Sequence, residues 1–215
     1  MTLKALLLDF GGVVVMAAYE LHHLTEKLLG LPSGFLTWRG PFDPASDPLW
    51  QAMQRDEITE REYWDIRARE IGQFVGQEWT VRDYTRLIKC SSPAEAIRPE
   101  ATETVRLARA NGIKVGVLSN ELELFYGQEC VDRMPIIHEL DALIDASHTK
   151  ILKPEPEAYQ MALAALGVVA HETLFVDDQG RNIVGAQQVG LETLHFDVTR
   201  PAVCYAQVRL RLGLG

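Results

Sequence analysis

The chain has 215 residues, 47% of them hydrophobic, so it can bury a substantial core and hold a second, smaller domain. Its net charge of −9 argues against a nucleic-acid-binding protein, because such binding depends on clustered Lys and Arg side chains. No apolar run reaches the roughly 18 to 20 residues that cross a bilayer and no signal peptide is expected, so we predict a cytoplasmic monomer or homodimer without nucleic-acid or membrane partners.

The chain begins with an apolar segment that ends in a carboxylate. Five of the six residues in 3–8 are apolar, which predicts a strand buried on both faces of a parallel sheet. Asp9 stands where this strand should end, and Gly11 and Gly12 allow the backbone to turn sharply there. Taken alone, Asp9 is equally well interpreted as an acidic residue that caps a turn.

The next 80 or so residues show helical spacing rather than strand spacing. Helices are expected over 20–29, 49–55, 59–71 and 81–89, with a Pro- and Gly-rich loop over 31–48. The third of these helices starts with Thr59-Glu60-Arg61-Glu62, which fits the capping-box pattern. Trp38, Arg39 and Phe42 in the loop either line a substrate pocket or pack in the core of this helical block.

From residue 98 onward, strands and helices alternate. The expected strands cover 113–118, 142–144, 173–176 and 192–196, and the expected helices cover 100–111, 122–132, 155–166 and 182–189. This alternation predicts crossover units and a parallel sheet covered by helices. We therefore predict an α/β core domain formed by 1–15 and 95–215, with 16–94 inserted after the first strand as a helical domain.

The three cysteines show no pattern of a metal site or of disulfide pairing. Cys90, Cys130 and Cys204 form no close pair and lack metal-binding spacing. We expect them to be reduced and structural.

Polar side chains follow four of the predicted strands or lie in the loop after them. Each one alone has an ordinary interpretation as a helix cap, a turn or a surface lysine. In an open parallel sheet, however, ligands bind at the carboxyl ends of the strands, so these residues are expected to converge. They are Asp9, Ser119, Asn120, Lys153, Asp177 and Asp178.

Such a set favours phosphoryl transfer through a carboxylate. Asp9 and Asp178 offer the oxygen ligands that suit Mg²⁺, which would offset their mutual repulsion. Lys153 and Ser119 could stabilise the non-bridging oxygens of a phosphoryl group. Asp9 could then attack phosphorus and form an aspartyl-phosphate that water hydrolyses.

Four segments resemble the motifs of the haloacid dehalogenase superfamily, in the same order. They are D-F-G-G-V, V-G-V-L-S-N, L-K-P-E-P-E-A-Y and F-V-D-D-Q-G-R-N-I-V-G-A-Q-Q-V-G. Within the superfamily, the chain resembles the capped subgroup that contains the amino-terminal phosphatase domain of soluble epoxide hydrolase. The segment L-W-Q-A-M-Q-R-D-E-I-T-E-R-E-Y-W is similar to the cap of that subgroup.

The resemblance implies a Rossmann-like three-layer α/β/α core, with 16–94 as a helical cap domain. It also implies roles for single residues. Asp9 would be the nucleophile, Ser119 the phosphate-binding hydroxyl and Lys153 the stabilising lysine, while Asp178, with Asp177 beside it, would hold Mg²⁺. Gly11, Gly12 and Asn120 would lie in the phosphate-binding site, and the carbonyl of Gly11 would bind the metal. The substrate implied is a small phosphorylated metabolite.

One position departs from the family pattern. Most phosphatases of the family have an aspartate two residues after the nucleophile, which acts as general acid and base, and here that residue is Gly11. His22 or His23 could take over this role, although either could be an ordinary helix residue. A 2-haloacid dehalogenase, which needs neither that aspartate nor a metal, and a phospho-ligand-binding module with little turnover are the alternative functions.

Overall fold

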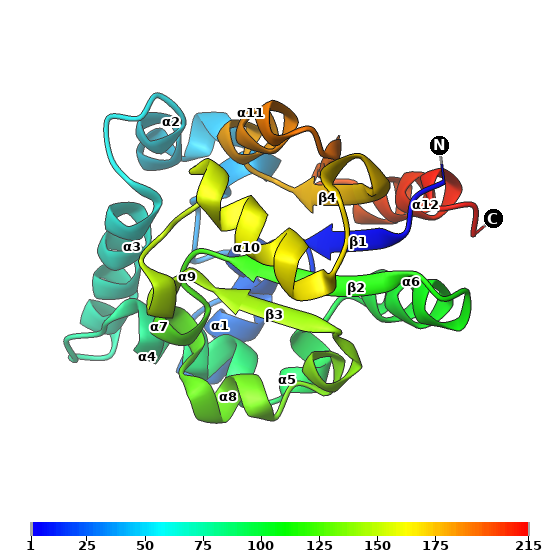
Figure 1. Ribbon diagram of the computed structural model, residues 1–215. Helices are drawn as coiled ribbons and strands as arrows, with labels where there is room; N and C mark the ends of the chain where they lie inside the picture. Colours follow the sequence, from blue (N-terminus) through cyan, green and yellow to red (C-terminus); the bar gives the residue numbers. More distant parts are fainter. Residues whose placement is uncertain (1, 215) are drawn as a thin grey trace.

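A parallel β-sheet forms the centre of the computed structural model, which describes residues 2–214 (Figure 1). The described strands are β1 (Ala5–Leu8), β2 (Lys114–Ser119), β3 (Ala142–Asp145), β4 (Thr173–Asp177) and β5 (Glu192–His195). They are ordered β3-β2-β1-β4-β5, and every neighbouring pair is parallel. Leu8 of β1 is in register with Val117 of β2 and Val176 of β4, so the carboxyl ends of these three strands lie side by side. The predicted α/β fold with a parallel sheet is confirmed.

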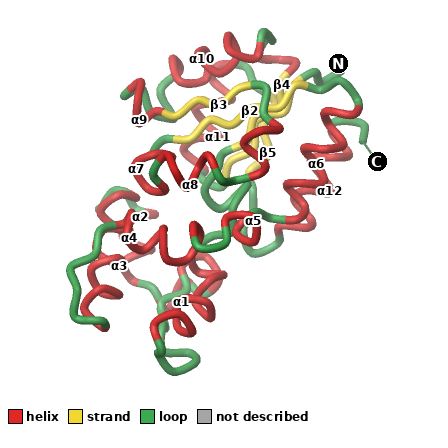
Figure 2. Tube along the Cα trace, turned by 90° about the horizontal axis from the view of Figure 1, so that it is seen from below, coloured by secondary structure: helices red, strands yellow, loops and turns green. Residues whose placement is uncertain are grey.

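Helices cover both faces of this sheet, which gives the three layers visible in Figure 2. One face carries α10 (Pro156–Leu166) and α11 (Gly180–Val189), and the other carries α6 (Pro99–Ala110) and α12 (Pro201–Arg211). Because side chains alternate along a strand, Ala5 and Leu7 pack toward the first pair of helices and Leu6 and Leu8 toward the second. All four are fully buried, as the continuous apolar run of β1 predicts.

The residues between β1 and α6 form a helical block with an apolar cluster of its own. The elements of this block are η1 (Ala18–Leu21), α1 (His22–Leu29), η2 (Gly40–Phe42), η3 (Pro44–Ser46), α2 (Pro48–Gln54), α3 (Glu60–Phe74), α4 (Val81–Thr85), η4 (Arg86–Cys90) and α5 (Pro93–Ala96). Its buried cluster runs from Ala17 to Ile88 and is separate from the two clusters that flank the sheet. In Figure 1, the arrowheads of β1 and β4 point toward α2 and α3. The division into a core and an inserted cap, with boundaries at 15/16 and 94/95, stays a prediction.

Several helices differ from the sequence-based expectation. The predicted helix 122–132 is split into α7 (Leu122–Tyr126) and α8 (Gln128–Asp132), because Gly127 has a φ of +74°. The predicted helix 81–89 is α helical only in α4, and its second half, η4, has π-helical hydrogen bonding. Helix α12 was not predicted. The remaining short helices are η5 (Pro135–Glu139), α9 (Ala146–Thr149) and η6 (Ala170–Glu172).

Cys90 and Cys130 form a disulfide, so the prediction of three reduced cysteines is wrong for this pair. Cys90 is the last residue of η4 and Cys130 lies on α8, with their Cα atoms 5.4 Å apart. The two residues are separated by 40 positions in sequence, so their spacing in the chain gave no indication of the pair. Cys204 is free and buried.

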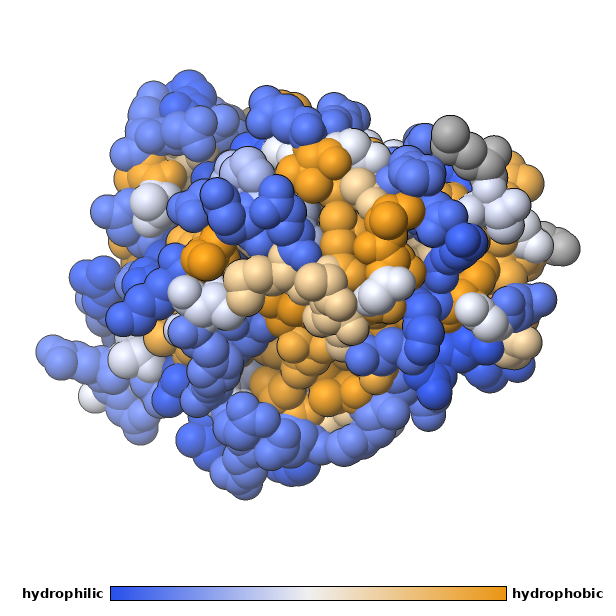
Figure 3. Space-filling model, viewed as in Figure 1, coloured by the Kyte–Doolittle hydropathy of each residue, from blue (hydrophilic) through white to orange (hydrophobic). Residues whose placement is uncertain are grey.

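The surface is mainly hydrophilic, with an apolar area in the middle of the face in Figure 3. In the view of Figure 1, β3 and α10 cross the middle of this face. β3 is an edge strand that pairs with β2 alone, and its Leu143 is 38% exposed. Among residues 2–214, no helix combines the length and the apolar character that crossing a membrane requires.

Candidate active site

Asp9 lies directly beyond the end of the central strand. Its backbone N–H donates to the carbonyl oxygen of Val176 at 2.8 Å, which extends the pairing of β1 with β4 by one residue. The side chain is 13% exposed, and its Oδ1 accepts a hydrogen bond from Lys153 Nζ at 2.6 Å. The structure thus brings Asp9 and Lys153 together, although they are 144 residues apart in sequence.

Lys153 is buried and held from two directions. Its Nζ also donates to Asp177 Oδ2 at 2.7 Å, so one ammonium group lies between two carboxylates. The Asn120 side chain fixes the Lys153 backbone, since Oδ1 accepts from Lys153 N at 2.7 Å and Nδ2 donates to Lys153 O at 3.1 Å. Burial alone would lower the pKa of Lys153, but Asp177 and Asp9 raise it above its ordinary value. Lys153 is therefore a fixed positive charge at neutral pH.

The two neighbouring aspartates have different surroundings. Asp177 is fully buried, and its oxygens accept hydrogen bonds from Lys153 Nζ, Gln179 N and Asn182 Nδ2. Asp178 instead borders two cavities at the carboxyl end of the sheet. Asp177 is thus placed to orient Lys153, and Asp178 is placed to meet a ligand.

Gly11 and Gly12 are also different from each other. Gly12 has a φ of +77°, and a Cβ at this position would lie 2.9 Å from Asp178 Oδ2. Its carbonyl oxygen accepts two hydrogen bonds from the guanidinium of Arg98, at 3.0 and 2.8 Å. A Cβ at Gly11, in contrast, would meet no heavy atom within 4 Å. Gly12 is therefore required for the close approach of the backbone to Asp178, whereas Gly11 leaves open space.

Ser119 ends β2, is buried, and lines one of the two cavities together with Asp9. Neither His22 nor His23 lines either cavity. His22 is buried in the helical block, where its ring centroid lies 4.2 Å from that of Trp38, and burial lowers its pKa to about 4. His23 is exposed. The two histidines are therefore poorly placed to replace the missing aspartate, and Trp38 packs in the core of the helical block.

The cluster of carboxylates is of a kind that suits a divalent cation. Oxygens of Asp9, Asp177 and Asp178 lie within 4.8 Å of one another. Burial raises the pKa of Asp9 to about 7, and burial together with the Asp9 charge raises that of Asp178 well above its ordinary value. Lys153 offsets only part of this negative charge. Asp9 and Asp178, with the Gly11 carbonyl, are the donors that would hold Mg²⁺, and the cation would favour their ionised forms.

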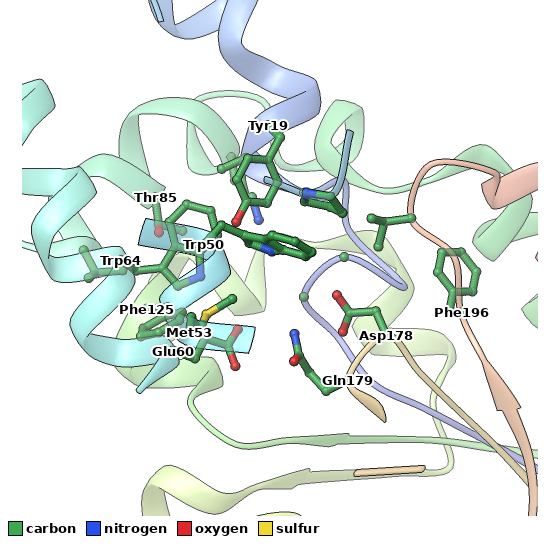
Figure 4. Close-up of a pocket in the computed structure, with 18 of the residues that line it drawn as sticks. Tyr19, Trp50, Met53, Glu60, Trp64, Thr85, Phe125, Asp178, Gln179 and Phe196 are labelled. Atoms are coloured by element: carbon green, nitrogen blue, oxygen red, sulfur yellow. The ribbon is translucent and has the colours of Figure 1, made fainter. Parts of the chain in front are cut away.

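Two cavities meet at Gly11 and Asp178. The first, of about 440 Å³, we call the polar cavity, and its lining includes Asp9, Ser119, Asn120, Lys153, Arg61 and Arg181. The second, of about 480 Å³, we call the aromatic cavity, and its lining includes Tyr19, Trp50, Met53, Trp64, Phe125 and Phe196 (Figure 4). The site therefore combines a charged compartment for a small anion with an apolar compartment beside it.

Three residues of the site were missed in the sequence. Arg98 is buried, and besides binding Gly12 it pairs with Glu20 at 2.6 Å. Lys89 lines the aromatic cavity and donates to Tyr126 Oη at 3.1 Å, and burial lowers its pKa to about 8. Glu60 lines both cavities. The capping box located Glu60 at the start of a helix, but no sequence signal indicated the direction of its side chain.

The chain belongs to the haloacid dehalogenase-like hydrolase family, whose model matches residues 3–190. Its parallel sheet with flanking helices is the fold that the resemblance implies.

Curated relatives include several kinds of enzyme. The chain is 26% identical over 212 residues to mouse acyl-CoA dehydrogenase family member 10, a match that covers 98% of this chain and 19% of the relative. It is 33% identical over 100 residues to a phosphatase of Mycobacterium tuberculosis, covering 46% of each chain. It is 31% identical over 99 residues to (S)-2-haloacid dehalogenase 4A of Burkholderia cepacia, covering 46% of this chain and 42% of the relative. Each match spans less than half of the relative, and phosphatases and dehalogenases both occur among them.

Solved structures show the same fold. The magnesium-bound hydrolase YfnB of Bacillus subtilis superposes with a TM-score of 0.65 at 17% identity, covering 90% of this chain and 86% of that one. The L-2-haloacid dehalogenase RSc1362 superposes with a TM-score of 0.58 at 22% identity, again covering 90% and 86%. At these identities the superpositions define the architecture and leave the substrate class open.

Proposed function

We propose that this protein is a Mg²⁺-dependent phosphatase that hydrolyses a small phosphate ester through an aspartyl-phosphate on Asp9. The observation that carries the proposal is the arrangement around Asp9, with Lys153 Nζ at 2.6 Å from its Oδ1 and Asp178 in the same carboxylate cluster. A lysine paired with an aspartate is by itself compatible with several reactions in which the aspartate is the nucleophile. The additional buried carboxylate beside it has a clear purpose only when a cation is bound.

In this proposal each residue in or beside the polar cavity has a separate role. Lys153 and Ser119 bind the non-bridging oxygens of the phosphoryl group, and Asn120 keeps Lys153 in place through its backbone. Asp177 holds the Lys153 ammonium from the buried side. Mg²⁺ held by Asp9, Asp178 and the Gly11 carbonyl would reduce the charge repulsion between the nucleophile and the phosphate. Asp9 is then free to attack phosphorus with the oxygen that faces the cavity.

The experiment is an assay of a panel of phosphorylated metabolites, with Mg²⁺ and with a chelator. We expect phosphate release that requires Mg²⁺, and we expect Asp9→Asn to lower kcat by about 10³-fold or more while the chain stays folded by circular dichroism. Rapid acid quenching followed by mass spectrometry of the peptide that contains Asp9 should show the added phosphoryl group. Retention of activity in Asp9→Asn would exclude this mechanism.

A 2-haloacid dehalogenase is the second candidate function. It is favoured by Gly11, because that reaction does not need an aspartate at this position, and by the dehalogenases among the relatives. The Asp178 carboxylate argues against it, since a metal-free site gains nothing from a second buried negative charge near Asp9. Halide release from (S)-2-haloacids in the presence of chelator would favour this candidate.

A phospho-ligand-binding module with little turnover is a third outcome of the same assays. It predicts no phosphate release from any ester and no label on Asp9, together with binding of the phosphate analogue beryllofluoride. Our proposal predicts release, label and binding together.

A further inference from the structure

The loop after β1, residues 9–13, has no side chain besides that of the proposed nucleophile Asp9 that could transfer a proton to the leaving group. At position 11 the chain has glycine, and a Cβ there would meet no heavy atom within 4 Å. The leaving oxygen of an alkyl phosphate departs as a strong base, so a phosphatase that acts on such esters needs an acid near this point. In the polar cavity, Lys153 is a poor acid because two carboxylates raise its pKa.

A carboxyl group from the helical block faces this open space. Among the described residues of segment 16–94, Glu60 alone lines both cavities, together with Gly11 and Asp178. Figure 4 shows the side chains of Glu60 and Asp178 pointing into the cavity from opposite sides. Glu60 therefore lies where the phosphoryl group in the polar cavity and its leaving group in the aromatic cavity would join.

The backbone that carries Glu60 is fixed by the start of α3. Thr59 and Glu62 form a reciprocal capping box, in which Thr59 N donates to Glu62 Oε2 at 2.7 Å and Glu62 N donates to Thr59 Oγ1 at 3.2 Å. The capping role that an acidic residue often has in the first turn is thus filled by Glu62. The Glu60 side chain is left to point into the cavity.

Both positively and negatively charged side chains surround Glu60. Its carboxylate lies 3.8 Å from the guanidinium of Arg181 on α11, and Asp177, Lys153 and Glu121 also act on it through space. The side chain is 39% exposed because it faces the cavity. Burial by the surrounding chain is the main effect, and it raises the pKa of Glu60 above its ordinary value, with Arg181 and Lys153 opposing. A raised pKa is the direction that suits a group that must donate a proton.

Lys89 is a second side chain of the helical block in these cavities that could donate a proton. It lines the aromatic cavity only, and its ammonium group is buried against Tyr126, to whose Oη it donates. The geometry therefore favours Glu60 over Lys89.

We propose that Glu60 is the general acid and base of this site, in place of an aspartate at position 11. This inference rests on the proposed phosphatase function. In the first step a carboxylate oxygen of Asp9 bonds to phosphorus, the bond from phosphorus to the leaving oxygen breaks, and protonated Glu60 gives its proton to that oxygen. In the second step a water oxygen bonds to phosphorus, Glu60 takes one proton from that water, and the bond between phosphorus and Asp9 breaks. The products are the free alcohol and inorganic phosphate, and Glu60 is protonated again.

The test compares two esters that differ in their need for an acid. For an alkyl phosphate we expect Glu60→Gln to lower kcat/KM by about 10²–10³-fold, whereas for p-nitrophenyl phosphate, whose leaving group needs little protonation, we expect a loss of about threefold or less. We expect Gly11→Asp in the Glu60→Gln background to restore at least about tenfold of the alkyl phosphate activity, because the open space accepts the new side chain.

Asp56→Asn is the matched control. Asp56 is the second carboxylate near Arg181, at 3.6 Å, but it is 81% exposed and lines neither cavity, so this variant should leave both activities unchanged. An equal loss for both esters in Glu60→Gln, or no loss for either, would overturn the role of Glu60. If the wild-type protein releases phosphate from neither ester nor from the metabolite panel, the proposed function itself fails, which is a different result.

Discussion

At the scale of single residues, neighbouring positions in the site have different roles. Asp177 and Asp178 are adjacent in sequence, yet Asp177 is the last residue of β4 and is buried against Lys153, whereas Asp178 lies beyond the strand and borders the cavities. Gly11 and Gly12 divide in a similar way, the first beside open space and the second against Asp178. The sequence motifs therefore identify the site, but the local backbone conformation determines the role of each residue in it.

We predict that Gly12→Ala is far more harmful than Gly11→Ala. An alanine at position 12 must adopt a φ of +77° and would place its Cβ 2.9 Å from Asp178 Oδ2. Such a residue costs about 1–3 kcal/mol, and displacement of Asp178 should also weaken Mg²⁺ binding. Urea denaturation and Mg²⁺ titration of the two variants test this prediction. Equal stability of both variants would contradict it, since Gly11→Ala should change the free energy of unfolding by about 0.5 kcal/mol or less.

At the scale of elements, the helical block is connected to the core by two segments that run side by side. Val15 and Ile97 form an antiparallel bridge, and Met16 N donates to Ala96 O at 2.9 Å. Arg98 joins this pair of segments to the site, because its buried guanidinium binds both the Gly12 carbonyl and Glu20. The planar fork of arginine donates two hydrogen bonds to each partner, whereas a lysine ammonium has only three donors. The position of the loop after β1, which contains Asp9 and Gly12, therefore depends on how the helical block begins and ends.

The disulfide adds a third connection between these elements. We predict that Cys130→Ser lowers the free energy of unfolding by about 2–4 kcal/mol, because the bond closes a loop between residues that are 40 positions apart. Thermal unfolding with and without a reductant measures this effect. Reduction should destabilise the wild-type protein and leave Cys130→Ser unchanged, and a wild-type protein that is insensitive to the reductant would contradict the prediction.

At the scale of the whole molecule, the uncompensated negative charge of the site opposes folding. The negative charges of Asp9 and Asp178 lie where water cannot solvate them fully, while the rest of the core is apolar on both sides of the sheet. The buried Lys153 compensates for part of this charge. If the proposed Mg²⁺ binds there, stability and metal binding are linked through the protonation of these carboxylates.

We predict that, without Mg²⁺, the contribution of Asp9 to stability is lost as the pH rises from about 4 to about 7. Its pKa is raised from 3.8 to about 7 in the folded chain, so the folded state holds this proton more tightly than the unfolded state over that range. Mg²⁺ should consequently raise the free energy of unfolding more at pH 7.5 than at pH 5. Urea denaturation at both pH values, for the wild-type protein and Asp9→Asn, measures the effect. An Mg²⁺ effect that is equal at the two pH values, or unchanged in Asp9→Asn, would contradict this prediction.

The sequence by itself determined the class of fold and the family. Apolar runs of strand length, the helical spacing between them and the polar residue at each strand end are local features, and parallel pairing makes those strand ends meet. For this reason Asp9, Ser119, Asn120, Lys153 and Asp178 could be predicted to lie around one site, and the structure brings them there.

Only the tertiary structure decided features that depend on segments far apart in the chain. Cys90 and Cys130 pair because η4 and α8 are brought together, His22 is enclosed by the aromatic cluster of the helical block, and Arg98 reaches Gly12 across 86 positions. The orientation of the Glu60 side chain is likewise a feature that only the tertiary structure decided. A capping box specifies where a helix begins. The packing of that helix over the sheet determines in which direction the side chains of its first turn point.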